Sequence, residues 1–341
     1  MWPGRFPDTR MHERDLLARL IAGPASGGAL AQACGQTRAA VWKRIAALRE
    51  AGVPIAARAG RGYVLEAPLE LLDAGAIRVA LPAPLRDELR ALDVAWTLES
   101  TNTALLQRET PARGVLVQLA ERQTGGRGRR GRQWASPLAA NIYLSLARAF
   151  GGGLARLPGL SLVAGVASVE ALHALGFRDV RLKWPNDLVV ASGEGGLRKL
   201  GGLLVEGGGE HAGPVRAVIG LGLNVRMPAA HGAAIAQPWT DLAALAGGTA
   251  PSRNAVVATL LAHWLPALAQ FDAHGLDAFL PRYAALDALA GRAIRVDGEQ
   301  GARHGVALGL AADGALRVRC EDGERVLHAG EVSVRAAEAP A

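Results

Sequence analysis

The sequence predicts a protein of several domains: a small helical module at the N-terminus, a central α+β domain and a β-rich segment at the C-terminus. Basic charge is concentrated in residues 1–66, which carry a net charge of +5, whereas the rest of the chain carries +2. From Val94 onward strand-like and helix-like runs alternate, and in 291–335 strand-like runs alternate with Asp-Gly turns. A chain of 341 residues, half of them apolar, is long enough for two or three cores.

The N-terminal module has the order of a helix–turn–helix unit. One helix follows Glu13, a short one spans 29–34, and Gly35 stands where a tight turn is needed. Thr37 can cap a third helix that Gly52 ends. Three apolar residues repeat along one face of this helix: Val41, Ile45 and Leu48.

Basic residues on this module favour an anionic partner, and the order of elements favours DNA. Two strand-like runs within 53–65 flank a Gly-Arg-Gly turn, which predicts a β-hairpin wing behind a recognition helix. We expect DNA contacts from six residues: Thr37, Arg38, Lys43, Arg44, Arg58 and Arg61. The alternative is a helical interaction domain with a solvated basic face.

The remaining bulk features favour a cytoplasmic protein. The most apolar segment, 157–177, is interrupted by polar residues and predicts a buried helix rather than a membrane span. The N-terminus lacks the pattern of a secretion signal. Cys34 and Cys320 form no redox or metal motif, and we expect no metal site built from protein ligands alone. Residues 67–92, with three prolines, read as a connector with a helical stretch.

A loop at 125–134 is the most specific feature of the central module. Four glycines and four arginines alternate between two predicted strands, 115–122 and 141–147. Such a loop cannot pack a core, and we expect it to be mobile when empty and to fold over an anion. Arginine forks suit phosphate and carboxylate oxygens. An RGG-like nucleic-acid segment or a solvated loop are the alternatives.

Three further motifs place polar groups beside apolar strands. The Lys-Trp-Pro-Asn-Asp-Leu run at 183–188 holds Asn186 and Asp187 between two strands, or forms an ordinary Asx turn. The Lys-Leu-Gly-Gly run that starts at Lys199 lets a ligand approach closely, or is an edge strand. Glu-Ser-Thr-Asn-Thr at 99–103 joins a strand at 94–98 to a helix at 103–108, where it binds a polar ligand or only caps the helix.

In this order, the four motifs resemble the catalytic domain of biotin–protein ligases between residues 97 and 225. The resemblance includes Ala-Asn-Ile-Tyr-Leu-Ser at 140–145 and Ile-Gly-Leu-Gly-Leu-Asn-Val at 219–225. Residues 22–77 resemble the winged helix of bacterial biotin operon repressors, through Thr-Arg-Ala-Ala-Val at 37–41 and Gly-Arg-Gly-Tyr at 60–63. The first ten residues match nothing in this family, which leaves Met11 as an alternative start.

The resemblance implies four segments. It implies a winged helix–turn–helix domain at 1–66, a linker at 67–92, an α+β ligase domain of the class II aminoacyl-tRNA-synthetase type at 93–288, and an SH3-like β-barrel at 289–336. The stretch 192–197 looks inserted, and we expect a hairpin turn with little effect on the chemistry.

The resemblance also implies an ATP-dependent reaction in two steps. Biotin and Mg-ATP give biotinyl-5′-AMP, which then acylates a lysine of the biotin carboxyl carrier protein of acetyl-CoA carboxylase. The implied catalytic residues are Lys199, Asp187, Arg129 and Lys183. The implied biotin-binding residues are Ser100, Thr101, Asn102, Gln123, Arg127, Gly128, Arg129 and Lys199. The implied ATP- or adenylate-binding residues are Arg129, Arg130, Arg132, Trp134, Asn186, Asn224 and Trp239.

Within this scheme Asp187 fits two tasks, accepting a proton from the incoming lysine or helping to place Mg²⁺. The two modules together predict repression of biotin-synthesis genes by an adenylate-bound homodimer on operator DNA. Three alternatives remain: a ligase whose winged helix binds no operator, a lipoate–protein ligase or octanoyl transferase, and a ligand-sensing transcription factor without catalysis.

Overall fold

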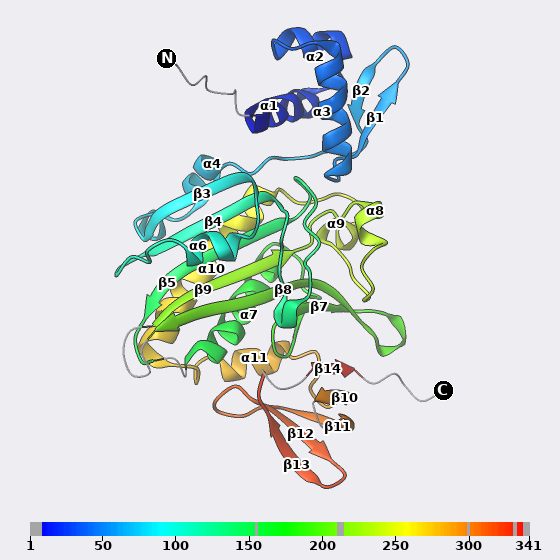
Figure 1. Cartoon of the computed structure of the whole chain (residues 1–341). Coiled ribbons are helices and arrows are strands. Elements are labelled where there is room, and N and C mark those ends of the chain that lie inside the picture. The colour runs from blue at the N-terminus through cyan, green and yellow to red at the C-terminus, as the bar shows by residue number, and fades with distance from the viewer. Residues whose placement is uncertain (1–8, 154–155, 210–214, 299–300, 330–332, 337–341) are drawn as a thin grey trace.

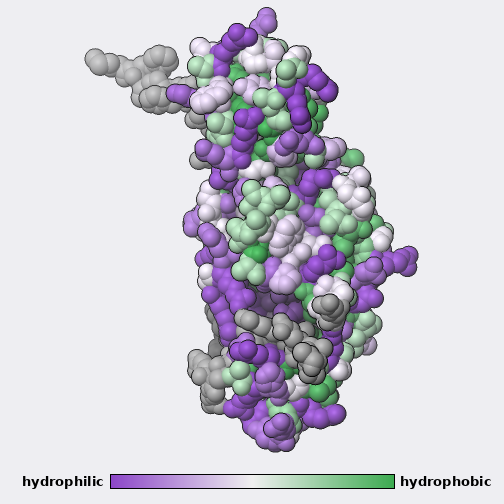
Figure 2. Space-filling model, turned by 90° about the vertical axis from the view of Figure 1, so that its right-hand side faces the viewer, coloured by the Kyte–Doolittle hydropathy of each residue, from purple (hydrophilic) through white to green (hydrophobic). Residues whose placement is uncertain are grey.

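The computed structural model describes residues 9–153, 156–209, 215–298, 301–329 and 333–336. A winged helix lies at one end of an elongated molecule, a seven-stranded sheet with its helices lies in the middle, and a five-stranded sheet lies at the other end (Figure 1). The winged helix and the central domain touch along a continuous surface (Figure 2). The predicted order of the three parts is therefore confirmed.

Three helices form the core of the winged helix: α1 (Thr9–Ala22), α2 (Gly27–Ala33) and α3 (Arg38–Glu50). Thr37 caps α3, because its hydroxyl accepts a hydrogen bond from the Ala40 N–H at 3.1 Å. Gly52 follows α3 with a φ of 105°, a conformation that favours glycine. The predicted apolar face is buried at Val41, Ile45 and Leu48.

The wing is a two-stranded hairpin of β1 (Ile55–Arg58) and β2 (Gly62–Leu65), in which Ile55 pairs with Leu65. The backbone of Gly62 lies against the turn before α2, since a Cβ atom there would be 2.4 Å from the Ala25 oxygen. Gly62 also has a φ of 76°. The predicted hairpin is therefore confirmed, with Arg58 and Arg61 exposed near its turn.

The helical stretch expected within the connector at 67–92 is present, and the segment packs on the central domain. This stretch contains α4 (Ala74–Ala80), α5 (Ala83–Arg86) and the start of β3 (Leu89–Leu98). Four of its side chains are buried in the core of the central domain: Leu72, Ile77, Leu81 and Leu89. Its apolar residues therefore make this connector part of the core of the central domain.

The central sheet has the strand order β3-β4-β5-β9-β8-β7-β6. Only the β3–β4 pair is parallel, and the other neighbours are antiparallel. The remaining strands are β4 (Val115–Gln123), β5 (Ile142–Phe150), β6 (Arg181–Lys183), β7 (Asp187–Ala191), β8 (Leu197–Gly209) and β9 (Val215–Leu223). Because β3 and β4 are parallel, their C-terminal ends lie at the same end of the sheet. The motif at 99–103 and the segment up to residue 134 therefore both start from that end.

Helices cover both faces of this sheet (Figure 1). On one face lie α7 (Leu157–Ala174) and α10 (Arg253–His274), and on the other lies α6 (Thr101–Leu106), which begins two residues before the helix predicted at 103–108. Two helices, α7 and α10, are long and apolar enough to span a membrane by length and composition alone, but both lie mostly buried in the core. The shorter helices are α8 (Ala229–Gly232), α9 (Leu242–Leu245) and α11 (Leu280–Leu286).

The C-terminal part is all-β, as predicted. It consists of β10 (Ala293–Gly298), β11 (Gly301–Leu310), β12 (Leu316–Cys320), β13 (Gly323–Leu327) and β14 (Ser333–Ala336). The turns predicted at Asp313-Gly314 and Asp322-Gly323 are present, whereas Asp297 and Gly298 are paired within β10. The Trp184 indole donates to the Gly314 carbonyl at 3.1 Å, which attaches this part to the central domain.

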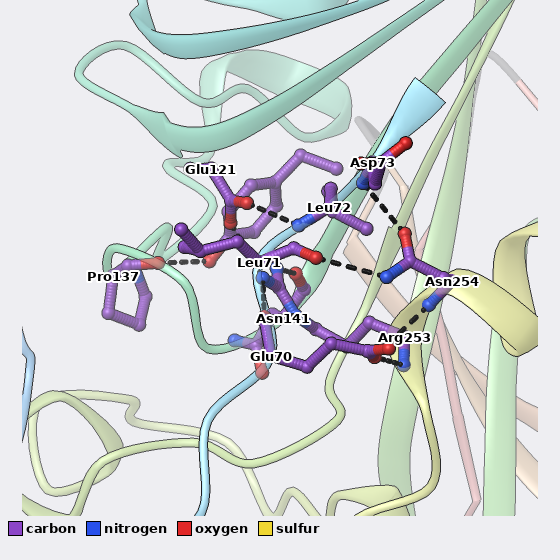
Figure 3. A network of polar contacts seen from close by, with 10 residues as sticks. Glu70, Leu71, Leu72, Asp73, Glu121, Pro137, Asn141, Arg253 and Asn254 are labelled. Carbon is purple, nitrogen blue, oxygen red and sulfur yellow. Dashed lines mark hydrogen bonds and ion pairs between the residues drawn. The ribbon is translucent and has the colours of Figure 1, made fainter. Parts of the chain in front are cut away.

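A buried polar network joins the residues after the wing to the sheet (Figure 3). The guanidinium of Arg253, at the start of α10, pairs with the Glu121 carboxylate of β4 at 2.7 Å, and both side chains are at most 4% exposed. Arg253 also donates to the carbonyls of Glu70 and Asn141, each at 3.0 Å. Glu121 accepts in turn from the Leu72 N–H at 2.6 Å. Both buried charges are therefore paired and hydrogen-bonded.

We predict that Arg253→Met destabilises the protein by about 3–5 kcal/mol, because it leaves the Glu121 carboxylate buried without its counter-ion. Urea denaturation followed by circular dichroism measures the change. The matched control is Arg317→Met, which breaks the exposed Arg317–Glu324 pair and should change the unfolding midpoint little. Equal midpoints for the two variants would show that the buried pair is not a stabilising contact.

Candidate active site

The four predicted motifs meet in one pocket at the edge of the central sheet. Fourteen of the residues expected to bind ligand or to catalyse line it: Ser100, Thr101, Asn102, Gln123, Arg127, Gly128, Arg129, Arg130, Arg132, Trp134, Lys183, Asn186, Asp187 and Lys199. The free volume is about 150 Å³. This is small beside the ~300–1,000 Å³ of usual ligand pockets, because the arginine loop lies across it.

Hydrogen bonds connect the polar residues at the start of α6 to the end of β4. Gln123 Oε1 accepts from the Thr101 N–H at 2.8 Å and lies 3.2 Å from the Thr101 hydroxyl. The Gln123 amide nitrogen donates to the Ser136 hydroxyl at 3.2 Å. Ser100 caps α6 by accepting from the Thr103 N–H. These bonds fix the orientation of each amide and hydroxyl that faces the pocket.

A second chain of contacts starts at Asn102, which is buried. The Ser145 hydroxyl donates to Asn102 Oδ1 at 2.5 Å, and Asn102 Nδ2 donates to a Glu206 oxygen at 2.8 Å. The other Glu206 oxygen pairs with Arg127 Nη2 at 3.2 Å. A Cβ atom on Gly220 would stand 2.2 Å from Asn102 Oδ1, so glycine is needed there. Strands β5, β8 and β9 thus position a side chain that belongs to α6.

A lysine–aspartate pair lies on the neighbouring strands β7 and β8. Lys199 Nζ is 2.7 Å from Asp187 Oδ1, and Lys183 Nζ is 3.9 Å from Asp187 Oδ2. Among the pocket-lining residues, all in the described part of the chain, Asp187 is the only Asp or Glu. Lys199 also lies 5.4 Å from the centre of the Trp134 ring. A register shift in the β7–β8 pairing beside Lys199 accompanies this arrangement.

The arginine loop is folded over the pocket by its own backbone. Gly128 N–H donates to the Arg132 carbonyl at 2.7 Å, and the Trp134 N–H donates to the Gly126 carbonyl at 2.9 Å. Between them lies a single 3₁₀ turn, η1 (Arg129–Gly131), in which Arg130 has a φ of 56°. The expected mobility of the loop without ligand stays a prediction.

Arg129 connects the loop to two other parts of the molecule. One guanidinium nitrogen donates to Asn186 Oδ1 at 3.2 Å, and the other donates to the Ala329 carbonyl of the C-terminal part. Burial lowers the pKa of Arg129, and the charge of Arg130 lowers it further, while Asp187 opposes this effect. An anion placed here would offset the cost of holding these charges together.

Two expected nucleotide-binding residues do not line the pocket. The Asn224 amide donates to the Thr240 carbonyl at 3.0 Å and is buried. The Trp239 indole donates to the Gly232 carbonyl at 3.1 Å and packs against that glycine. Gln237, from the same segment, lines the pocket instead. Their roles toward a nucleotide stay predictions.

The expected DNA-binding residues lie apart from this pocket, on the winged helix. Arg38, Lys43, Arg58 and Arg61 are exposed, whereas Arg44 is partly buried because its Nε donates to Gln36 Oε1 at 2.8 Å. The stretch 192–197 forms a single turn, η3 (Gly193–Gly195), which accepts a hydrogen bond from Arg292. None of its residues lines the pocket, which agrees with the expected small effect on chemistry.

The residues of the site that were not predicted include Ser145, Glu206, Gly220 and Gly222. They lie within runs that carried the resemblance, but their neighbours are far away in the sequence. Gly222 supports Trp134, since a Cβ atom there would lie 2.3 Å from the indole. The alternation of glycine with aliphatic residues at 219–223 was the available signal, and only the sheet register reveals its use.

Comparison with family models supports this combination of fold and site. The model of the biotin/lipoate A/B protein ligase family matches residues 94–224, the biotin protein ligase C-terminal domain matches 290–335, and a helix–turn–helix domain matches 12–64. These matches define an enzyme of the protein-ligase class that carries a helix–turn–helix domain.

The chain is also similar to characterised relatives along most of its length. It is 37% identical to the bifunctional ligase/repressor BirA of Salmonella typhimurium over 92% of this chain and 94% of that protein, and 36% identical to BirA of Escherichia coli over 95% and 97%. A solved biotin protein ligase of Aquifex aeolicus in complex with biotin and ATP superposes with a TM-score of 0.60 at 26% identity, covering 73% of this chain and all of that one. The chain therefore belongs to the family of bifunctional biotin–protein ligases and repressors.

Proposed function

We propose that the pocket joins biotin to ATP as biotinyl-5′-AMP and then transfers the biotinyl group to a lysine of the biotin carboxyl carrier protein of acetyl-CoA carboxylase. The observation that carries this proposal is the arginine loop folded over a Lys199–Asp187 pair beside an ordered set of amides and hydroxyls. The ligase relatives and the biotin- and ATP-bound ligase support it.

The first step brings two anions together. A biotin carboxylate oxygen attacks the α-phosphorus of ATP, a new P–O bond forms, and pyrophosphate leaves. Arg127, Arg129 and Lys199 offset the repulsion and stabilise the charge on the phosphoryl oxygens. Arg129 suits this task because its side chain is partly buried, and partial removal from water strengthens the interaction of its guanidinium with an anion.

Biotin and ATP require the loop to open first, since the free volume of about 150 Å³ is too small for both. Opening replaces the contacts of Arg129 with Asn186 and Ala329 by contacts with the adenylate. When the loop closes again, it excludes water from the mixed anhydride and protects it from hydrolysis. The buried indole Nε1–H of Trp134, which has no hydrogen-bond partner in the described part of the chain, is a donor available to the nucleotide.

The second step needs a base. The incoming lysine amine attacks the acyl carbon, AMP leaves, and the amine loses a proton, which Asp187 accepts. In the structure Lys199 Nζ lies 2.7 Å from Asp187 Oδ1, so this ion pair occupies the carboxylate. Once Lys199 turns to the phosphate, Asp187 is released for this task, while Lys183 stays near enough to steady it.

The donor set also fits Mg²⁺ that arrives on ATP. No cluster of three or more His, Cys, Asp or Glu suited to a metal occurs among the described residues. One carboxylate, Asp187, is what Mg²⁺ bound through phosphates and water requires of a protein. Such an ion would neutralise phosphate charge during the first step.

We further propose that the winged helix binds operator DNA and that the adenylate-bound form acts as a homodimer in the cytoplasm, repressing biotin-synthesis genes. The exposed basic residues of α3 and the wing support DNA contact. The alternative is a ligase whose winged helix binds no operator. A pure sensor or a lipoate ligase is less well supported, because the Lys199–Asp187 pair would serve no sensor and the BirA relatives extend through the winged helix.

We predict that Arg129→Ala lowers the rate of carrier biotinylation by about 100-fold or more, because a charged donor to the transition state is lost. The assay measures transfer of labelled biotin to a carrier domain in the presence of Mg-ATP. The control is Arg325→Ala, at an exposed ion pair in β13, which should retain full activity. Equal rates for Arg129→Ala and wild type would refute the role of the loop.

Glu206 provides a test of the biotin subsite. Glu206→Ala removes the acceptor that orients Asn102, so we expect biotin to bind about ten-fold more weakly. Glu206→Gln keeps an acceptor for Asn102 and should lose less affinity. Calorimetric titration of biotin into each variant measures the difference. Wild-type affinity in Glu206→Ala would place biotin away from Asn102.

The repressor proposal predicts adenylate-dependent dimerisation. Sedimentation velocity should show a larger dimer fraction with biotin and Mg-ATP together than with either alone. Because acceptor protein consumes the adenylate, adding carrier domain should return the protein to monomer. A dimer fraction that changes neither with biotin and Mg-ATP nor with carrier domain would favour the ligase-only alternative.

A further inference from the structure

The recognition helix exposes a large aromatic residue that the proposed DNA contacts do not include. The Trp42 side chain, in α3, is 62% exposed. Three large hydrophobic residues are at least 50% exposed in the described part of the chain, and the other two, Val79 and Val326, lie outside the winged helix. Single exposed apolar residues are common, so the position of Trp42 has to carry the argument.

Trp42 lies on the solvent face of α3. The opposite face is buried at Val41, Ile45 and Leu48. At helical spacing, the outward face carries Ala39, Trp42, Lys43 and Ala46. The two alanines leave the helix surface low on either side of the indole, so α3 can approach a groove closely.

Other polar side chains near the start of α3 are turned toward their own domain. The Thr37 hydroxyl caps α3, Arg44 Nε donates to Gln36, and the Arg38 guanidinium lies beside Gly28 of α2. Trp42 and Lys43 are left as the large side chains that protrude from the middle of the face. The amino-terminal half of a recognition helix is the part that contacts base edges, and Trp42 is the fifth residue of α3.

The chemistry of the major groove then selects the group that an indole can contact. Base edges there present hydrogen-bond donors and acceptors, and the one apolar group among them is the C5-methyl of thymine. The ring face of an indole placed against that methyl gains apolar contact, while the N–H at the ring edge stays available to a polar partner. We infer that Trp42 contacts a thymine methyl in each half-site and that it sets the sequence preference at that position.

This inference rests on the proposed operator binding and goes beyond it. A protein partner is the competing occupant of Trp42. The surroundings favour DNA, because Lys43 follows Trp42 on α3, the wing arginines of the same domain are exposed, and the first 66 residues carry a net charge of +5. An apolar contact framed by cations suits a polyanion whose groove contains isolated methyl groups.

The test begins by selecting binding sites from a random duplex pool with wild-type protein, biotin and Mg-ATP. In the enriched duplex each conserved thymine is replaced in turn by deoxyuridine, which removes only the methyl group. We expect one thymine per half-site whose replacement weakens wild-type binding about four-fold, the value of one buried methyl. Trp42→Ala should bind the parent duplex more weakly and be insensitive to this replacement, which closes a thermodynamic cycle.

Control variants separate the indole from charge and from general apolar exposure. Trp42→Phe should keep part of the sensitivity to the methyl group. Lys43→Ala should reduce the salt dependence of binding, whereas Trp42→Ala should leave that slope unchanged, because an indole contacts no phosphate. Val79→Ala, at the exposed valine of α4, should match wild type in every measurement.

The outcomes distinguish this inference from the proposal beneath it. If wild-type protein enriches no duplex, operator binding fails and the inference fails with it. If it enriches a duplex but Trp42→Ala shows the same affinity and the same response to deoxyuridine, operator binding stands and the role of Trp42 is overturned. Loss of a protein–protein contact in Trp42→Ala, with DNA binding intact, would likewise overturn it.

Discussion

The buried ion pair between Arg253 and Glu121 is the contact around which the molecule is assembled. Neither charge could remain in the core alone, because the cost of removing an unpaired ion from water exceeds the contribution of its packing. The pair is therefore formed only when α10, β4 and the residues after the wing come together. Glu70 strengthens this arrangement, since its carboxylate accepts from the Ser252 hydroxyl and from backbone N–H groups at the start of α10. The segment that leads to the DNA-binding module is consequently a structural part of the ligase domain.

The active-site arrangement follows from a second constraint, the crowding of positive charge. Arg127, Arg129, Lys183 and Lys199 converge on a pocket whose lining, within the described residues, contains one carboxylate. In the structure, oxygen atoms of the protein offset these charges. Arg127 pairs with Glu206, Lys199 pairs with Asp187, and Arg129 donates to backbone and amide oxygens. In the proposed reaction, a nucleotide replaces these partners with phosphate oxygens. The protein thus holds its cations in place before the anion arrives, which lowers the reorganisation that the reaction requires.

Much of this site could be predicted from the sequence because its motifs are local. Glycine and arginine spacing identified the loop, and the turn between β6 and β7 placed Asp187. Glu206 and Ser145 could not be found in this way, since each forms a hydrogen bond with Asn102 that depends on the pairing of β5, β9 and β8. The packing of the connector at 67–92 could not be predicted for a different reason. Its prolines were visible, but only the burial of Leu72 and Ile77 shows that the intervening residues pack against the sheet. Sequence patterns identify elements, whereas long-range pairing decides which side chains meet.

The proposed coupling between adenylate and DNA binding has a continuous set of contacts available to it. Gln123 holds Ser136, and two residues further on the Leu138 N–H donates to the Ala51 carbonyl at the end of α3. Leu138 and Ala139 belong to the same apolar cluster as the winged-helix core. The base of the arginine loop is therefore packed directly under the recognition helix. Such continuity does not by itself establish coupling, because a shared contact transmits nothing unless it has two arrangements of similar free energy. The loop supplies a candidate for two arrangements, since in the proposed reaction a nucleotide exchanges the partners of Arg129. A shift that reached Leu138 would bear on the orientation of α3.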